Sequence, residues 1–372
     1  MGYNSKHLTE YGGNAVKAYE NRVSSASTVT RYTIMNITEA CACAAMLFGK
    51  VSRHVSDHRL ILLVILFNVV AIGARGIVSL VADRATHSRH SGVRLGVLLF
   101  ALGFLWPVEF GITLKVILTA VGSAVYHAFA ASSIQAKSAF RASGIGFLGA
   151  GAVLGTAIGR YASFYGYLCI IFFMILACPT DKCANLPEAK EDRQIKAPKT
   201  AFSPVFILLL PTAIGALSYA VSSLSFAWDV NRKTMLLIAL AMAFGRGLGG
   251  LVTDLLGHTV TVAASLGGGT ALLLFCADSK LLSLGGIVLI SMAAAPLLSL
   301  LFRCMPRHPG FSVSLAAGMA YLGYVALKYY PIREGLLPLI GGIVLLIAVG
   351  TDLFLYFMGR RAQARKEVAD HA

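Results

Sequence analysis

The sequence predicts an all-α membrane protein whose twelve transmembrane helices form two pseudo-symmetric six-helix bundles. Of its 372 residues, 57% are hydrophobic and only 13% are charged, a composition that soluble globular domains do not have. Apolar runs long enough to cross a hydrocarbon core of about 30 Å, which takes about 20 residues of helix, follow one another along the chain. A charged pattern also recurs once in each half, which indicates a duplicated unit.

Twelve apolar segments are the candidate transmembrane helices. They lie at 30–49, 60–82, 92–107, 110–133, 141–160, 162–178, 204–226, 234–255, 258–277, 281–302, 310–329 and 335–358. A polar segment rich in charge and proline separates the sixth from the seventh. We therefore expect a six-helix bundle at 30–178, a cytosolic linker at 179–203 and a second six-helix bundle at 204–358. A cytosolic N-terminal segment at 1–29 and a cytosolic tail at 359–372 flank them.

The repeated pattern is the stretch RGIVSLVAD at 75–83, which returns as RGLGGLVTD at 246–254. The arginine, the glycine after it, the Leu-Val pair and the aspartate keep their spacing across an offset of 171 residues. A weaker match pairs VLGTAIGRY at 153–161 with YLGYVALKY at 321–329, at an offset of 168. Two parallel halves joined by a cytosolic linker are the plan expected of transporters whose halves rock about a central site.

The distribution of basic residues predicts the orientation in the membrane. When the N-terminus is placed in the cytosol, most lysines and arginines outside the spans are cytosolic, as the positive-inside rule requires. Lys50, Arg53 and Arg59 in the first outer loop go against this trend. The basic residues form no patch interleaved with aromatic residues, so no nucleic-acid partner is expected. We expect a multi-pass protein of the cell membrane with both termini in the cytosol.

The chain resembles the major facilitator superfamily over nearly its whole length. That family's motif after the second helix, G-x-L-a-D-R-x-G, is matched by SLVADRAT, which keeps Asp83 and Arg84, and by GLVTDLLG in the second half, which keeps Asp254. The resemblance implies the major facilitator fold and a cytosolic gate that closes when an acidic residue binds a neighbouring helix end. A carboxylate is favoured at a helix N-terminus. Asp83, Arg84 and Asp254 are therefore expected to form a gate.

Two further spans carry the resemblance. The fifth, ASGIGFLGAGAVLGTAIGRY, has glycines in the spacing of the family's antiporter motif, although Arg160 stands where that motif continues with proline. The fourth, KVILTAVGSAVYHAFAAS, is similar to the GSA-x-x-H stretch of the fosmidomycin-resistance branch of drug exporters, whose histidine is His127 here. This resemblance implies an antiporter with the proton as coupling ion, and no cofactor is expected.

Glu39 lies in the middle of the first span, where an ionised group costs at least about 2.5–3.5 kcal/mol and normally faces the interior of the bundle. Asn36 shares its face by helical spacing. We interpret the pair as a proton-binding or substrate-binding site, and a structural hydrogen bond between helices is the alternative. Further expected members of this site are Lys115, Tyr126, His127 and Ser222.

Arg75 and Arg246 hold equivalent positions in the two copies of the repeat, roughly two turns before Asp83 and Asp254. Their symmetry favours a shared structural role at the gate. Direct contact with an anionic substrate is the alternative.

No metal site is expected, although four residues are weak candidates. Cys43 and Met46 follow Glu39 on one face of the first span, and sulfur ligands suit soft metal ions. His54 and His58 lie in the first outer loop and could bind zinc. A stripe of this kind more often packs in a core, and such a loop is more often solvated.

The sequence thus predicts a secondary active transporter, a proton-coupled exporter of a small organic compound that works by alternating access, and not an enzyme. A metal-ion or metallophore carrier is the alternative within transport. An integral-membrane metal-dependent enzyme and a non-transporting sensor are the alternatives from other classes. The expected partners are a small-molecule substrate and the lipid bilayer, and the expected state is a monomer.

Overall fold

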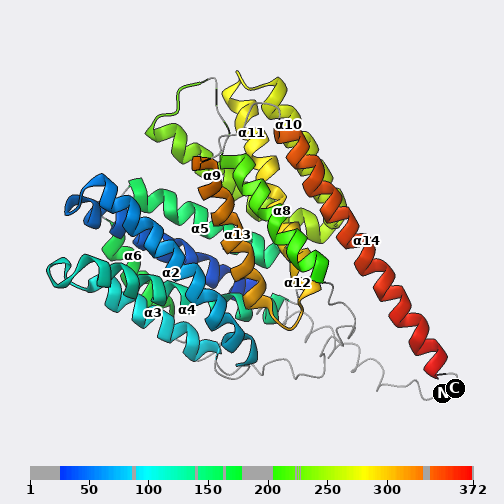
Figure 1. Ribbon diagram of the computed structural model, residues 1–372, viewed down its shortest axis with the longest axis horizontal. Coiled ribbons are helices and arrows are strands. Elements are labelled where there is room, and N and C mark those ends of the chain that lie inside the picture. Colours follow the sequence, from blue (N-terminus) through cyan, green and yellow to red (C-terminus); the bar gives the residue numbers. More distant parts are fainter. Residues whose placement is uncertain are drawn as a thin grey trace, which may run out of the picture.

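The computed structural model is a set of helices packed side by side (Figure 1). The structure describes residues 26–85, 89–138, 141–161, 165–177, 204–222, 224, 226, 228–329 and 336–370. Most of the expected N-terminal segment at 1–29 and the whole expected linker at 179–203 lie outside the described residues. The N-terminal half below means residues 26–177, and the C-terminal half means residues 204–370.

The N-terminal half is drawn from blue to green in Figure 1. Its first helix (residues 26–45) runs on through a π turn, η1 (Met46–Lys50), and a 3-10 turn, η2 (Val51–Arg53). The helices that follow are α2 (Asp57–Arg84), α3 (Arg89–Leu105), the short η3 (Val108–Phe110), α4 (Ile112–Ser138), α5 (Ala142–Tyr161) and α6 (Gly166–Ala177). Each of the helices α2 to α6 lies where an apolar span was expected, η3 lies at the junction of two expected spans, and α6 is shorter than the expected segment 162–178.

The C-terminal half continues from green to red. Its helices are α8 (Pro204–Ser222), α9 (Arg232–Leu256), α10 (His258–Phe275), α11 (Lys280–Met292), α12 (Ala294–Cys304), α13 (Pro309–Tyr329) and α14 (Leu336–Asp370). The expected span 281–302 is therefore broken at Ala293. Pro296 in the first turn of α12 explains the break, because it has no N–H to donate to the carbonyl of Met292.

The expected tail at 359–372 is helical as far as Asp370, because α14 extends through it. Its place in the cytosol stays a prediction. The sequence RRAQARKE continues the helix with residues of high helix propensity. The polar end of α14 is therefore an extension of the last apolar helix.

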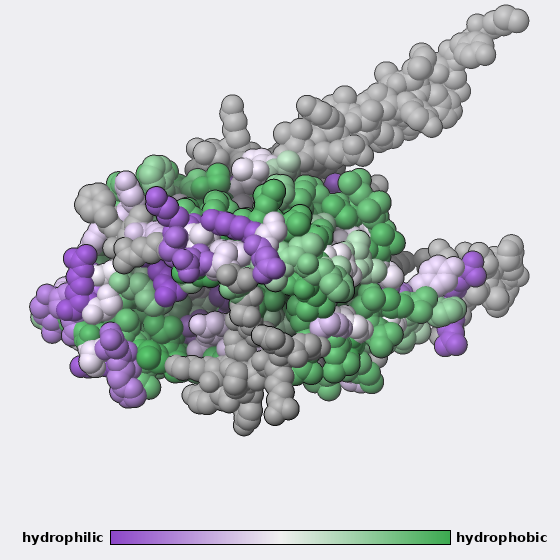
Figure 2. Space-filling model, turned by 90° about the horizontal axis from the view of Figure 1, so that it is seen from above, coloured by the Kyte–Doolittle hydropathy of each residue, from purple (hydrophilic) through white to green (hydrophobic). Residues whose placement is uncertain are grey.

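Among the described residues, nine helices are long and apolar enough to cross a membrane, and Gly166–Ala177 is a shorter apolar helix. Many of their large apolar side chains face outward. Ile77, Leu255 and Phe275 are 72%, 81% and 84% exposed, which in water would be unfavourable for so many residues. Figure 2 shows hydrophobic side chains over much of one face, with hydrophilic ones mainly on its left part. This surface suits contact with lipid.

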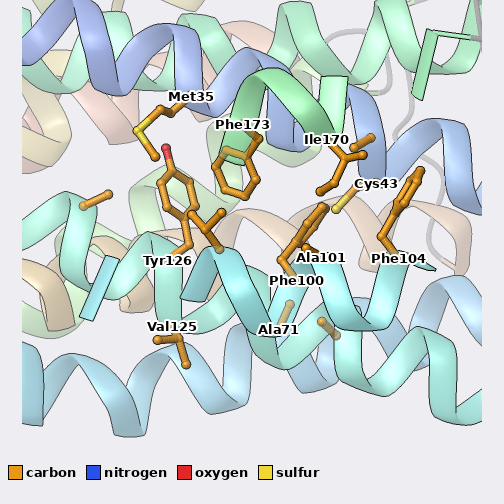
Figure 3. Packing of buried hydrophobic residues seen from close by; sticks show 14 of the residues in the cluster. Met35, Cys43, Ala71, Phe100, Ala101, Phe104, Val125, Tyr126, Ile170 and Phe173 are labelled. Carbon is orange, nitrogen blue, oxygen red and sulfur yellow. The ribbon is translucent and has the colours of Figure 1, made fainter. Parts of the chain in front are cut away.

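Two clusters of buried hydrophobic residues form the interior, one in each half. The first is drawn from residues between Tyr32 and Ala177, and Figure 3 shows its aromatic centre. There Phe173 of α6 packs edge-on against Phe100 and Tyr126, with ring centroids 5.4 and 4.9 Å apart. The second cluster is drawn from residues between Leu210 and Ala348.

The two halves meet mainly along two helix pairs, α2 with α13 and α5 with α9, and α13 also contacts α4 and α12 contacts α5. Small residues occupy both crossings. Between α2 and α13, the hydroxyl oxygens of Ser79 and Ser314 lie 2.9 Å apart. Between α5 and α9, an added Cβ at Gly146 would lie 3.2 Å from the Cα of Gly250. Small side chains let helix backbones approach closely, so each half is in near-backbone contact with the other.

A second glycine face of α5 packs on the first helix. An added Cβ at Gly151, Gly155 or Gly159 would meet the carbonyl oxygen of Thr33, Ile37 or Cys41 respectively. The spacing of four residues places these three glycines on one face of α5. Since α5 touches the first helix on one side and α9 on the other, it links the two halves.

We expect the substitution Gly155→Ala to destabilise the protein by about 1–3 kcal/mol, the usual cost of overpacking. The new Cβ would meet the carbonyl oxygen of Ile37. This oxygen belongs to a helix backbone and cannot move away as a flexible side chain could. Gly73→Ala is the matched control, because no atom lies within 4 Å of an added Cβ there. The unfolding temperature in detergent, followed by intrinsic fluorescence, should fall for Gly155→Ala alone. Equal temperatures for both variants would contradict the packing of α5 on the first helix.

Candidate functional site

Glu39 is buried in the first helix, with 3% of its surface exposed, and three polar side chains contact its carboxylate. The ring atom Nε2 of His127, on α4, lies 3.2 Å from Oε2. Cys43, one turn further along the first helix, donates its thiol to Oε1 over 3.4 Å. Ser123 of α4 also hydrogen-bonds the carboxylate. His127, which was expected in the same site as Glu39, therefore contacts it, and the function of this contact stays a prediction.

The local sequence of α4 explains why Ser123 and His127 both reach Glu39. They are four residues apart and so share one face of the helix. The preceding Gly122 faces α3, where an added Cβ would meet the backbone of Phe100. The close contact of α3 with α4 on the glycine side leaves the Ser123 and His127 face toward the first helix.

Arg75 of α2 adds a positive charge to this group. It interacts electrostatically with Glu39 and Cys43, and its Nε atom is buried without a hydrogen-bond partner. The sequence analysis placed Arg75 at the gate, but it lies more than two turns before the end of α2 and close to Glu39. We call Glu39, Cys43, Arg75, Ser123 and His127 the Glu39 cluster.

Asn36 joins the first helix to α5. Its amide nitrogen Nδ2 donates to the carbonyl oxygen of Leu148 over 2.6 Å, which is the interhelical bond that the sequence analysis kept as an alternative. The side chain is 1% exposed, and its carbonyl oxygen Oδ1 is buried without a partner. One half of this amide is therefore structural and the other half is free to accept a hydrogen bond.

Tyr126 lies in the aromatic core of the N-terminal half. It is fully buried, and its hydroxyl donates to the carbonyl oxygen of Tyr32 over 3.4 Å. Figure 3 shows this hydroxyl directed toward Met35, with Phe173 beside the ring. Tyr126 therefore packs in the core of this half, and its expected binding role stays a prediction. The backbone of Ser222 ends α8, and its side chain lies outside the described part of the chain.

Lys115 does not reach the Glu39 cluster. It is fully buried near the start of α4, and its amine donates to the carbonyl oxygens of Gly103, Phe104 and Trp106, the last over 2.8 Å. The last carbonyls of a helix have no partners within it, and a cation is favoured there. Lys115 therefore caps the C-terminal end of α3.

Replacing Lys115 by methionine tests this capping role against the proton-relay role. We expect Lys115→Met to lower stability by about 1–3 kcal/mol, because buried carbonyls lose their donor. Proton coupling in the folded fraction should be unchanged, since no contact links Lys115 to Glu39. The measurements are the unfolding temperature in detergent and the charge that a pH jump displaces in proteoliposomes. Normal stability together with lost coupling would show that Lys115 belongs to the proton path.

The carboxylate of Asp83, near the end of α2, accepts three hydrogen bonds. The backbone N–H groups of Gly310 and Phe311 donate to it over 2.8 and 3.1 Å, and the Ser132 hydroxyl of α4 donates over 2.6 Å. Gly310 and Phe311 lie in the first turn of α13, where N–H groups have no partner within the helix. Asp83 thus caps the N-terminus of α13, where the helix dipole favours a negative charge.

Asp254, near the end of α9, makes the same contact with α5. Its two carboxylate oxygens accept the backbone N–H groups of Ala142 and Ser143 over 2.8 and 3.1 Å. These are the first two residues of α5. Asp254 therefore caps the N-terminus of a helix in the opposite half, as Asp83 does.

The two caps are equivalent under the repeat. Asp254 follows Asp83 by 171 residues, and the N–H donors in α13 follow those in α5 by 168, which are the two offsets found in the sequence. Each acid belongs to one half and binds a helix of the other. We call these contacts the two aspartate latches. They fasten the halves together at the end of the molecule where α2 and α9 end and α5 and α13 begin.

The two remaining gate candidates differ from the latches. Arg84, the last residue of α2, is exposed, and among the described residues no hydrogen bond or ion pair of its side chain is present. Arg246 of α9 donates from Nη1 to the carbonyl oxygen of Gly149 on α5 over 3.3 Å. Arg246 therefore lies at the interface of the halves but deeper than Asp254.

The weak metal candidates do not gather into a site. In the part of the chain that the structure describes, no group of three or more His, Cys, Asp or Glu residues could hold a metal ion. His54 is exposed, with its ring at 2.9 Å from the carbonyl oxygen of Lys50, and His58 is exposed in the first turn of α2. Met46 accepts a hydrogen bond from Thr119 over 3.4 Å. Cys43 alone of the four contacts Glu39.

Polar side chains join three helices in the C-terminal half, and the sequence analysis did not predict these contacts. Asp352 of α14 accepts from the Thr259 hydroxyl over 2.9 Å and lies 4.0 Å from Arg303. His258 contacts the Ser299 hydroxyl at 3.0 Å. These bonds join the start of α10 to α12 and α14. Nothing in the spacing of single polar residues on three different spans could have revealed them.

No model of a known protein family matches the chain, and neither does the sequence of any curated protein. Solved structures do match it. One is the crystal structure of FucP, a major facilitator superfamily transporter, in the outward conformation: the TM-score is 0.56, the identity 14%, and the match covers 90% of this chain and 99% of that one. Another is a bacterial homologue of the iron transporter ferroportin in an outward-facing state, with a TM-score of 0.54, 11% identity, and 91% and 99% of the two chains covered. The chain therefore has the fold of major facilitator transporters.

Proposed function

We propose that this chain is a secondary active transporter of the major facilitator superfamily, which exports a small organic compound in exchange for protons. Its twelve transmembrane helices form two six-helix bundles that alternate access to a central site. The observation that carries the proposal is the buried contact of 3.2 Å between Glu39 and His127 in the middle of the N-terminal half. The shared fold with two transporters supports it.

The Glu39–His127 contact can take up and release a proton at Glu39 while His127 stays neutral. When Glu39 is ionised, the ring N–H of His127 donates to it. When Glu39 is protonated, its O–H donates to the neutral ring. In the first case a negative charge faces Arg75, and in the second it does not. Proton binding therefore changes the net charge of the site, which is what couples proton movement to substrate movement in our proposal.

The aspartate latches supply the conformational part of the proposal. Each holds a helix N-terminus of the opposite half, so the side on which they lie stays closed while they are formed. Opening this side requires both to break. Charge-assisted hydrogen bonds of this kind are each worth about 1.5–3 kcal/mol, a cost that proton and substrate binding must offset in the transport cycle.

We further propose that the latches, both termini and the 179–203 linker face the cytosol. In a variant without native cysteines, an impermeant maleimide added to intact cells should label a cysteine at position 278, in the turn between α10 and α11. It should not label Ala189→Cys in the linker until the cells are opened. The reverse pattern would overturn the orientation.

The function itself is tested in proteoliposomes that contain the purified protein and a trapped pH-sensitive dye. We expect a compound that the protein carries to change the internal pH when it is added outside, and a pH gradient to drive its uptake. The enzyme and sensor alternatives predict no such flux for any compound. A metal carrier predicts flux of metal ions and not of organic compounds, so the same vesicles are also tested with Fe²⁺, Zn²⁺ and Cu⁺.

A further inference from the structure

Two arginines lie deep inside spans, one in each copy of the repeat. Arg75 is nine residues before the end of α2, and Arg246 is ten residues before the end of α9. At 1.5 Å per residue this is about 14–15 Å from the helix ends. A charge at such depth costs at least about 2.5–3.5 kcal/mol unless it is paired or wet. Each therefore requires a partner.

The two arginines differ in how their charge is balanced. Arg75 interacts with the carboxylate of Glu39. For Arg246, the described residues provide no carboxylate, and its side chain has a single hydrogen bond of 3.3 Å to the carbonyl of Gly149. Arg246 is partly buried, and a charge removed from water without an opposite charge is unfavourable. Among the described residues, its positive charge is therefore not balanced.

The carbonyl groups of α5 place Arg246 at the level of Asn36. Asn36 donates to the carbonyl of Leu148, and Arg246 donates to the next carbonyl, that of Gly149. Glu39 follows Asn36 by less than one turn of the first helix. Polar groups of the N-terminal half and the arginine of the C-terminal half thus meet around one turn of α5.

Two buried polar atoms near this level have no partner. One is the acceptor Oδ1 of Asn36, whose side chain is 1% exposed, and the other is the donor Nε of Arg75. Buried polar groups normally have hydrogen-bond partners. Asn36 thus offers a free acceptor and Arg75 a free guanidinium donor, and Arg246 donates to the α5 carbonyl that follows the one bound by Asn36. A bound ligand could satisfy these groups.

The balance of charge decides the class of ligand. Arg75 interacts with Glu39, and Arg246 has no carboxylate partner among the described residues. The other acidic side chains that the structure resolves in detail lie in loops, at helix ends, or, as Asp352 does, against Thr259 at the start of α10. The excess charge at this level is positive. A guanidinium offers a planar pair of N–H donors that fits a carboxylate or phosphate.

We propose that the substrate is a small organic anion, bound between the Glu39 cluster and Arg246, with Asn36 accepting a hydrogen bond from a hydroxyl or N–H group of the same molecule. The proposal rests on the proposed transport function and names its substrate class. Arg75 and Arg246 are then binding residues that each half contributes, and not only parts of a gate.

The test is binding to purified protein in detergent at low ionic strength. The probes are monocarboxylates from acetate to benzoate, methylphosphonate and inorganic phosphate, with the matching amides and amines as neutral and cationic counterparts. We expect at least one anion to bind and its counterparts not to. Arg246→Gln should weaken that anion about tenfold to a hundredfold, and Arg246→Lys less. Arg303→Gln is the control, because Arg303 pairs with Asp352 outside this site, and it should leave binding unchanged.

The outcomes separate this inference from the function it rests on. If no anion binds better than its counterpart, or if Arg246→Gln binds the anion as tightly as the unchanged protein, the inference is wrong. Transport is judged separately, by the charge movement that a pH jump produces in proteoliposomes. If the charge movement is present but neutral compounds or cations bind, the proposed transport function is kept and the anionic substrate class is rejected. If anions bind but the charge movement is absent, the anion site is kept and proton-coupled transport is rejected.

Discussion

Replacing Glu39 by glutamine is expected to abolish proton-coupled transport while leaving the fold intact. Glutamine keeps the size of the side chain and an oxygen that accepts hydrogen bonds from Cys43 and His127, but it cannot bind or release a proton. With one proton exchanged per substrate, a gradient of one pH unit is worth about 1.4 kcal/mol and sustains roughly tenfold accumulation. In Glu39→Gln the accumulation ratio should fall to about one.

This expectation is measured as substrate uptake into proteoliposomes against time, with and without a pH gradient. The matched control is Glu109→Gln, which makes the same change at an exposed glutamate in η3 and should behave as the unchanged protein. Downhill exchange of substrate, measured without a pH gradient, distinguishes a coupling residue from a binding residue. Glu39→Gln should keep this exchange if Glu39 only couples protons, and lose it if Glu39 binds the substrate. If uptake by Glu39→Gln still depends on the pH gradient, the Glu39 cluster has a structural role and does not couple protons to transport.

The second large effect is expected at the aspartate latches. Asn in place of Asp83 keeps one oxygen for Gly310 or Phe311 but loses the charge and brings an NH₂ group toward a backbone N–H. A loss of about 1–3 kcal/mol from the closed state shifts the equilibrium between the two conformations by roughly 5- to 150-fold toward opening. Because Asp254 makes the equivalent contact in the other half, Asp83→Asn and Asp254→Asn should act in the same direction, and together more strongly.

The shift is measured as a distance distribution between spin labels at Arg84 and Arg307, which are exposed at the ends of α2 and the α12–α13 turn. The longer distance should gain population in each latch variant. Asp278→Asn is the control, since it changes an exposed aspartate in the turn between α10 and α11 and should have no effect. An unchanged distribution in the double latch variant would contradict the role of these contacts.

The helices of this fold follow closely from the sequence. Apolar length alone places most spans within a few residues, because a segment that must cross lipid cannot be polar over much of its length. The sequence repeat also relates the two aspartate latches to each other. The offsets of 171 and 168 residues, found from RGIVSLVAD and VLGTAIGRY, relate the acids and the helix N-termini of the two latches.

The parts that the sequence could not predict depend on backbone atoms and on contacts between distant spans. The donors in the aspartate latches are backbone N–H groups, which every residue except proline has. The identity of Ala142 or Phe311 therefore does not show that its N–H group binds an aspartate. Lys115 was expected at the binding site because it lies on the same span as His127, and its amine donates to the carbonyls at the end of α3. The break at Ala293 is caused by Pro296, but apolar length alone predicts an unbroken span there.

The central claim is that Glu39 exchanges the coupling proton, and one measurement tests it without knowledge of the substrate. Proteoliposomes adsorbed on a solid-supported membrane are exposed to a sudden change of external pH, and the charge displaced by proton binding is recorded. We predict a transient charge movement in the unchanged protein and in Glu109→Gln, and none above the protein-free background in Glu39→Gln. A displacement in Glu39→Gln equal in size and pH dependence to that of the unchanged protein would contradict the account.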